Sequence, residues 1–288
     1  MGFNMEIIKD PKQIQELTLQ LRCSDKVISF VPTMGYFHEG HLSLMRWARE
    51  NSDIVFVSLF VNPTQFGPKE DLNSYPRDFE RDKKLAEEVG VDYLFAPEKS
   101  DMYTEDHCTW VNSPKLSQYL CGKSRPGHFQ GVCTIVLKLF NLVNPHIAVF
   151  GEKDYQQLVI IKKMVQDLNI PVKVVGRPIV REPDGLAMSS RNAYLTEKER
   201  KDAAQIYKGL QKAQKWVKKG LVDSESIISK LTECYMENIP SGEIDYIEIV
   251  DPEKLKPVEE IKDRALLAVA IYLGKARLID NIMLEVKK

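Results

Sequence analysis

Short apolar runs alternate with helical patterns along the first two-thirds of the chain. Apolar residues at helical spacing fill segments such as 77–89, which ends before Gly90, and 129–143, which ends before a proline. The runs of strand length are 6–8, 27–31, 54–60, 91–95, 147–150 and 172–175. Such alternation is typical of α/β proteins. We predict a Rossmann-like parallel sheet with helices on both faces.

The pattern changes after a turn-rich stretch at 181–185. Two helical patterns, 196–219 and 224–236, come first, and three strand-like runs follow them. The strand-like runs are 244–250, 266–272 and 276–284. We therefore expect a Rossmann-like domain over residues 1–180 and a smaller C-terminal α+β domain over 181–288. A hinge at 181–185 would let the second domain close over the active site.

Composition and charge favour a small-molecule partner. The chain has 40 basic and 41 acidic residues, so its net charge of −1 provides no broad positive field for nucleic acid or an anionic membrane. The five cysteines are scattered without a C-x-x-C pair, and we find neither a signal peptide nor an apolar run of membrane-spanning length. We expect a cytoplasmic protein with reduced thiols.

A loop that leads into a helix carries the clearest chemical pattern. It follows the run 27–31, and an apolar helical pattern begins after it at Leu42. Free N–H groups at such a helix start bind anions, so phosphate is the expected ligand. His38 and His41 lie three residues apart, which places both imidazoles on one side of a helical turn, and Gly40 leaves room for close approach. For two such histidines taken alone, a capping or packing role is the plainer interpretation.

Two short motifs resemble those of nucleotide-activating enzymes. Residues 38–41 resemble the H-x-G-H signature of the nucleotidyltransferase superfamily, whose members act at the α-phosphorus of a nucleotide. Residues 188–191, M-S-S-R, resemble the K-M-S-K-S loop of the same superfamily. Serine hydroxyls and a guanidinium suit the β- and γ-phosphates. A serine-rich surface turn is the plainer interpretation of 188–191 alone, and the order of the two motifs favours the phosphate loop.

Three further segments narrow the resemblance. They are F-V-N-P-T-Q-F-G at 60–67, R-P-G-H-F at 125–129 and G-E-K-D-Y-Q-Q-L at 151–158. Together with the two motifs above, they resemble in order the pantothenate synthetase family over roughly residues 31–195. This resemblance implies condensation of (R)-pantoate with β-alanine to pantothenate, AMP and pyrophosphate through a pantoyl-adenylate. It also implies ATP with Mg²⁺ as substrate and a homodimer formed through the first domain.

The resemblance also implies roles for individual residues. His41 would be the catalytic histidine with His38 in support, Lys153 would be a cation for the phosphates, and Gln65 and Gln157 would bind pantoate. The expected ATP contacts are Met34, Gly35, Tyr36, Phe37, His38, Glu39, Gly40, His41, Gly151, Glu152, Lys153, Asp154, Val180 through its backbone, Met188, Ser189, Ser190 and Arg191.

Some positions leave questions open. No carboxylate cluster claims a metal, and Asp82 either approaches one or, as we prefer, is a charge on a helix surface. Thr64 and Gln130 stand where the family often has Met and Arg, which would alter the shape of the substrate site and not the reaction.

Three other functions compete with this interpretation. A nucleotidylyltransferase would use the same histidines but would not need the paired amides of Gln65 and Gln157. An aminoacyl-tRNA synthetase is disfavoured by the neutral charge and the short C-terminal segment. A catalytically silent nucleotide-binding regulator would not need to retain the two histidines, Lys153 and Arg191.

Overall fold

The computed structural model describes residues 5–68 and 70–286 and divides into two units. The first unit comprises Met1–Pro114, Arg125–Glu152 and Gln157–Pro178. The second comprises Lys115–Ser124, Lys153–Gln156 and Ile179–Lys288. The second unit therefore includes two short segments, 115–124 and 153–156, that lie well before the expected hinge. Lys153 belongs to this unit.

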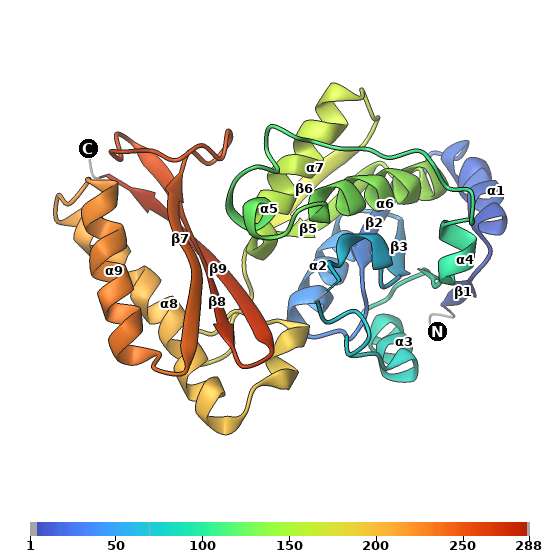
Figure 1. Cartoon of the computed structure of the whole chain (residues 1–288). Coiled ribbons are helices and arrows are strands. Elements are labelled where there is room, and N and C mark those ends of the chain that lie inside the picture. The colour runs from blue at the N-terminus through green and yellow to red at the C-terminus, as the bar shows by residue number, and fades with distance from the viewer. Residues whose placement is uncertain (1–4, 69, 287–288) are drawn as a thin grey trace. The chain divides into compact units, whose positions relative to one another are not determined.

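A six-stranded, wholly parallel sheet forms the centre of the first unit (Figure 1). Its order is β1-β4-β3-β2-β5-β6. The strands are β1 (Glu6–Ile8), β2 (Ile28–Thr33), β3 (Ile54–Leu59), β4 (Tyr93–Phe95), β5 (Ile147–Gly151) and β6 (Lys173–Arg177). The strand order reverses between β2 and β5, and ligands of open α/β sheets bind beyond the carboxyl ends of the strands at such a point. The histidine loop follows β2, and the G-E-K-D segment follows β5.

Helices cover both faces of this sheet, as predicted. They are α1 (Pro11–Arg22), α2 (Glu39–Glu50), α3 (Phe79–Glu88), α4 (Lys99–Met102), α6 (His128–Val143) and α7 (Tyr155–Asp167). Successive strand residues face opposite sides of a sheet. Val31 packs in a core with Met45 of α2 and Ala86 of α3. The ring of Phe30 lies 6.5 Å from that of Phe140 in α6 on the other face.

A three-stranded antiparallel sheet and two long helices form most of the second unit (Figure 1). The sheet order is β7-β8-β9, with β7 (Gly242–Val250), β8 (Arg264–Leu273) and β9 (Ala276–Glu285). The helices α8 (Glu197–Lys218) and α9 (Ser224–Asn238) supply the other half of its core, in which Leu278 of β9 packs with Leu210 and Leu231. The unit also contains α5 (Leu120–Ser124). The predicted α+β organisation is confirmed.

Local sequence signals account for several helix ends. Asp10 caps α1 by accepting from the N–H of Lys12, and Thr196 and Glu199 form a reciprocal capping box at the start of α8. Asn144 ends α6 in a left-handed conformation. Among the residues described, no helix is long and apolar enough to cross a membrane.

Candidate functional site

The histidine motif lies at the start of α2. This helix begins at Glu39, three residues before the apolar pattern starts, because His38 caps it. Nδ1 of His38 accepts a hydrogen bond from the N–H of Gly40 at 3.1 Å, and Nδ1 of His41 accepts from the N–H of His38 at 3.3 Å. The two imidazole centroids are 4.1 Å apart. The structure thus brings the two histidines together at the positive end of the α2 dipole.

These two hydrogen bonds fix which nitrogen carries the proton in each neutral ring. A backbone N–H can only donate, so Nδ1 of His38 and of His41 must hold a lone pair. The ring proton is then on Nε2. Each imidazole can therefore present an Nε2–H donor without losing its helix-capping bond, and protonation of Nδ1 would break that bond. The motif is suited to donate hydrogen bonds to an anion.

Our preferred interpretation of Asp82 as a helix-surface charge is wrong. Only 1% of this residue is exposed. Its two carboxylate oxygens accept hydrogen bonds from the N–H groups of Tyr36 and Phe37, both at 2.6 Å. Asp82 therefore holds the main chain of the histidine loop from α3. The sequence contains a signal for this, because Asp82 stands in the stripe Phe79, Asp82, Ala86, Val89, whose other members are apolar.

The loop held by Asp82 has an unusual backbone conformation. The φ angles of Gly35 and Tyr36 are 86° and 53°, in the left-handed region. A Cβ atom on Gly35 would lie 3.0 Å from Oδ2 of Asp82, so glycine permits the close approach. Burial raises the pKa of Asp82, and the two backbone hydrogen bonds oppose that rise. Good hydrogen-bond geometry thus offsets part of the cost of burying this carboxylate.

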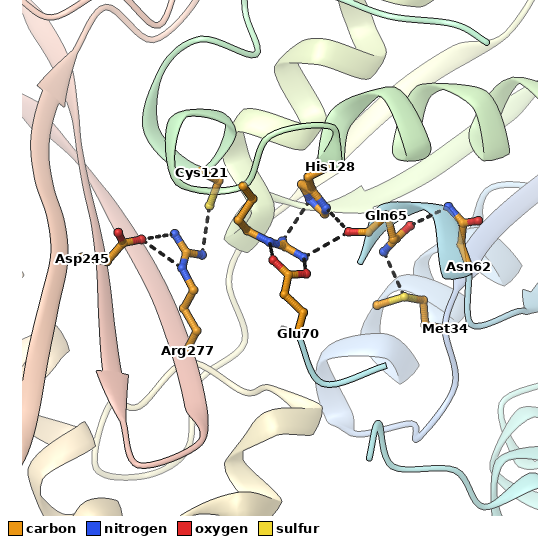
Figure 2. Close-up of polar contacts among 9 residues, drawn as sticks. Met34, Asn62, Gln65, Glu70, Cys121, His128, Asp245 and Arg277 are labelled. Atoms are coloured by element: carbon orange, nitrogen blue, oxygen red, sulfur yellow. Dashed lines mark hydrogen bonds and ion pairs between the residues drawn. The ribbon is translucent and has the colours of Figure 1, made fainter. Parts of the chain in front are cut away.

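A buried amide network orients Gln65 (Figure 2). Oδ1 of Asn62 accepts from the hydroxyls of Thr64 and Tyr103, both at 3.0 Å, so Nδ2 of Asn62 must be the donor. Nδ2 donates to Oε1 of Gln65 at 3.1 Å and to the carbonyl of Gly131 at 3.2 Å. The Nε2 end of Gln65 consequently points toward Met34, with its nitrogen 3.0 Å from Sδ. Gln65 therefore presents N–H donors beside the histidine loop.

Asn62 is a residue that sequence reasoning missed, although it lies in the quoted motif 60–67. It is 1% exposed, and it connects Gln65 to α6. The approach of α6 is close, because a Cβ atom on Gly131 would lie 2.4 Å from the carbonyl oxygen of Thr64. Thr64, one of the two atypical positions, contributes a hydroxyl to this network. Gln130, the other, is partly buried in α6.

The R-P-G-H-F segment holds the main chain of Gln65. Arg125 forms a two-pronged ion pair with Glu70, with both N–O distances at 2.6 Å, and its Nη2 also donates to the carbonyl of Gln65 at 3.3 Å. Nδ1 of His128 lies 2.8 Å from the same carbonyl, which can only accept, so His128 carries its proton there. Burial alone would raise the pKa of Glu70, but the hydrogen bond and charge of Arg125 bring that pKa below its ordinary value.

The two glutamines of the D-Y-Q-Q sequence have different environments. Gln156 is buried in the second unit, where its Nε2 donates to the carbonyls of Leu116 and Tyr119 at 3.0 and 2.7 Å. It therefore ties down the segment 115–124. Gln157 belongs to the first unit and is partly exposed. Within residues 5–68 and 70–286 its side chain makes no hydrogen bond, so the predicted pantoate amide is available to a ligand.

Several candidate ATP residues lie in two segments of the second unit. Nζ of Lys153 is 3.8 Å from the carboxylate of Asp154, which is exposed. Residues 180–188 form a hairpin in which the carbonyl of Val180 accepts from the N–H of Met188 at 3.0 Å. The hairpin leads directly into a 3₁₀ turn, η3 (Ser190–Tyr194), which Ser189 caps by accepting from the N–H of Arg191 at 3.3 Å.

Other predicted residues lie at the edges of these segments. Glu39 is exposed and pairs with Arg46 along α2. Gly151 ends β5, and a Cβ atom there would meet no neighbouring atom within 4 Å. Glu152 opens the 3₁₀ turn η2 (Glu152–Asp154). Throughout residues 5–68 and 70–286, no group of three or more His, Cys, Asp or Glu side chains is arranged to hold a metal ion.

Comparison with known proteins identifies relatives along the whole described chain. Residues 6–283 match the family Pantoate-beta-alanine ligase. A pantothenate synthetase from Maridesulfovibrio salexigens is 59% identical over 282 residues, which cover 98% of this chain and 100% of the relative. One from Fervidobacterium nodosum is 52% identical over 281 residues, 98% and 100% of the two chains.

Solved structures agree with the sequence relatives. The crystal structure of pantothenate synthetase from Thermus thermophilus superposes with a TM-score of 0.91 at 44% identity, and the match covers 96% of this chain and 99% of that one. The pantoate-β-alanine ligase from Francisella tularensis has a TM-score of 0.80 at 35% identity, with coverage of 97% and 98%. The Francisella structure is a complex with βγ-ATP and β-alanine.

Proposed function

Because the chain belongs to the pantoate-β-alanine ligase family, we propose that it makes pantothenate in two steps, through a pantoyl-adenylate formed from ATP. The overall activity is the ligation of pantoate to β-alanine. Family membership therefore decides for a ligase over the nucleotidylyltransferase, the aminoacyl-tRNA synthetase and the silent regulator. The order of steps and the roles of individual residues are what we propose here.

In the first step, the pantoate carboxylate attacks the α-phosphorus of Mg-ATP and pyrophosphate leaves. The observation that carries this proposal is the pair of histidines at the start of α2, each of which accepts a backbone hydrogen bond at Nδ1. His38 and His41 present Nε2–H donors at the positive end of the α2 dipole, which suits charge that develops on the phosphates. His41 is the catalytic histidine and His38 supports it. Mg²⁺ arrives with ATP and is held largely by phosphate oxygens and water.

Pantoate binds to the two amides of the first unit in this scheme. The network around Asn62 directs the N–H end of Gln65 toward Met34 of the histidine loop, and such donors suit the carboxylate or a hydroxyl of pantoate. Gln157 provides a second amide that is not committed to a partner in the described chain. In the second step, the neutral amine of β-alanine attacks the mixed-anhydride carbonyl, and AMP departs.

The second unit supplies further phosphate ligands in our proposal. Lys153 provides a cation, and Ser189, Ser190 and Arg191 bind the β- and γ-phosphates with hydroxyls and a guanidinium. The backbone of Val180 contacts adenine. The remaining ATP contacts are those expected from the sequence, in the segments 34–41, 151–154 and 188–191. Closure of the C-terminal domain would protect the adenylate from water.

Two further properties complete the proposal. We propose that the protein forms a homodimer, because the sequence resemblance to the family implies this assembly. We also propose a cytoplasmic location, which is supported by the five cysteines, all of which are free thiols.

Isotope exchange tests the first step alone. With pantoate, Mg²⁺ and ATP but no β-alanine, labelled pyrophosphate should exchange into ATP, because the bound adenylate can revert. Omission of pantoate should abolish the exchange. Hydroxylamine should trap the activated carboxyl as a hydroxamate. If exchange is absent with pantoate and AMP still forms once β-alanine is added, the adenylate mechanism is wrong.

A further inference from the structure

Two adjacent residues near the end of the chain contact both candidate ATP segments of the second unit. Asp280 and Asn281 lie on β9, far in sequence from either segment, and they are 4% and 8% exposed. Successive residues of a strand face opposite sides of the sheet. One buried dipeptide can therefore contact two different segments. No motif described above includes either residue.

Asp280 holds the hairpin that leads to the M-S-S-R turn. Its carboxylate accepts two hydrogen bonds from the guanidinium of Arg181, at 2.6 and 2.9 Å. The same guanidinium donates to the carbonyl of Gly185 at 3.1 Å, and its centre lies 3.6 Å from the ring centroid of Tyr207 in α8. Arg181 is thereby fixed on both sides. Because Arg181 pairs with Ala187 across the hairpin, the start of the turn at Met188 is fixed with it.

Asn281 holds the other candidate segment. Its Nδ2 donates to the carbonyl oxygen of Lys153 at 3.0 Å. The carboxylate of Asp280 also accepts from the N–H of Asn281 at 2.8 Å, so the two contacts are mechanically linked. Burial raises the pKa of Asp280, while the bonds and charge of Arg181 and the charge of Lys153 act in the opposite direction. The ammonium of Lys153 is therefore within electrostatic range of this carboxylate.

We infer that Asp280 and Asn281 are positioning residues that hold Lys153 and the hairpin before Arg191 in the arrangement that binds the phosphates of ATP. This inference rests on the function proposed above. Asp280 acts through Arg181, and Asn281 acts through the main chain of Lys153. Neither residue needs to touch ATP. A buried ion pair contributes little to stability on average, so its retention here agrees with a role in specifying geometry.

The structure offers a matched control for each residue. Asn238 also donates from Nδ2 to a backbone carbonyl of the second unit, that of Cys234 at 2.7 Å, but within its own helix. Asp245 also accepts two hydrogen bonds from an arginine on the same sheet, Arg277, at 3.0 and 2.6 Å, although both reach its Oδ2. Figure 2 shows Arg277 between Asp245 and Cys121 of the segment 115–124. Across residues 5–68 and 70–286, the guanidinium donates its hydrogen bonds to these two residues and not to Lys153 or the hairpin.

The experiment compares Asn281→Ala and Asp280→Asn with Asn238→Ala and Asp245→Asn. Calorimetry with a non-hydrolysable βγ-substituted ATP analogue gives the nucleotide affinity, and pyrophosphate release gives KM for ATP and for pantoate. We expect Asn281→Ala and Asp280→Asn to weaken nucleotide binding about tenfold, the loss of one or two hydrogen bonds from a positioned charge. KM for pantoate should stay within about twofold in both, as should nucleotide binding in both controls.

Each other outcome overturns the inference. Unchanged nucleotide binding in Asn281→Ala would show that Lys153 does not need the hydrogen bond from Asn281. This variant keeps the Asp280–Arg181 ion pair, so it still tests the inference if Asp280→Asn fails to fold. Equal losses for ATP and pantoate, or equal losses in the control variants, would show a general loosening of the unit. A wild-type enzyme that exchanges no pyrophosphate with pantoate would instead contradict the proposed function, so the two failures are distinguishable.

Discussion

A buried aspartate in the first unit contacts the main chain of the histidine loop directly, whereas a buried aspartate in the second unit holds an arginine. Asp82 accepts from two consecutive backbone N–H groups, and Asp280 pairs with Arg181. Burial raises the pKa of both carboxyls. Burial of a charge costs free energy for both carboxylates, and different hydrogen-bond partners offset that cost in each case.

The difference follows from what each segment must provide. The histidine loop offers Nε2–H donors whose positions depend on its main chain, so that main chain has to be fixed, including the left-handed residues Gly35 and Tyr36. The segments of the second unit offer side-chain charge from Lys153 and Arg191. Their anchors hold the main chain of Lys153 and the hairpin before Arg191, through hydrogen bonds to the carbonyl of Lys153 and from the guanidinium of Arg181. Direct contact with Asp82 holds the main chain of the histidine loop in one position. Contact through the main chain or through another residue leaves the charged side chains of the second unit able to adjust to a ligand.

The largest effect is expected in the first unit, where a fixed donor is lost. His41→Ala should lower kcat by about a hundredfold or more, the usual cost of removing a donor to transition-state charge. His41→Asn keeps an acceptor near the position of Nδ1 and should therefore retain the helix cap, but it should be as inactive as alanine. Circular dichroism checks the fold. Recovery of activity in His41→Asn would show that His41 acts only as a capping residue.

A pair of substitutions separates the ligands of the two units. Gln157→Ala in the first unit should raise KM for pantoate by roughly ten- to a hundredfold with little change for ATP, because its proposed partner is a substrate hydroxyl or carboxylate. Arg191→Ala in the second unit should do the reverse. Steady-state titrations of both substrates in both variants measure this. Equal losses for both ligands would contradict the division of roles.

A smaller effect is expected when Asp82 keeps its shape and loses its charge. Asp82→Asn retains one acceptor oxygen but turns an NH₂ group toward a backbone N–H, so it should lower the free energy of unfolding by about 1–3 kcal/mol. Turnover should fall about tenfold, since the loop main chain is then held at one point. Chemical denaturation and kcat measure the two effects. Loss of stability with full turnover would show that the anchor serves only the fold.

The pH dependence of this variant has a definite sign. The pKa of Asp82 is raised, chiefly by burial, so the folded protein holds the proton more tightly than the unfolded chain does. The wild type should therefore gain stability relative to Asp82→Asn as the pH falls through the raised pKa toward the ordinary aspartate range near about 4. Glu70, whose pKa is lowered, should behave oppositely and lose its stabilising contribution as the pH falls. Unfolding curves across this range would check both signs.

The sequence predicted most of the fold, and the roles assigned to the residues of the named motifs stay predictions. Periodicity located β1 and the end of α6 at the residues found, because these depend on neighbours in the chain. Asp82 was misassigned because its partners lie 45 and 46 residues away. No local rule connects such positions.

A common signal nevertheless marks both buried aspartates. Asp82 stands in an otherwise apolar helical stripe, and Asp280 stands in the alternating row Ala276, Leu278, Asp280, Ile282 and Leu284 of β9. A charge at a core position of a regular pattern needs a buried partner. The signal locates the residue that needs a partner and leaves the partner undetermined. The structure was therefore needed to show that Asp82 contacts the histidine loop and that Asp280 contacts Arg181.

The smallest expected effect concerns Thr64, the atypical residue beside Gln65. Thr64→Val removes the hydroxyl that donates to Oδ1 of Asn62, and Tyr103 still donates to that oxygen, so the amide network keeps its direction. KM for pantoate should rise by about two- to tenfold, the loss of one neutral hydrogen bond, and KM for ATP should not change. Thr18→Val is the matched control, because Thr18 donates to the carbonyl of Leu142 at 2.7 Å, between α1 and α6. It should cost stability without raising KM for pantoate. Equal KM values in wild type and Thr64→Val would show that Asn62 orients Gln65 without help from this hydroxyl.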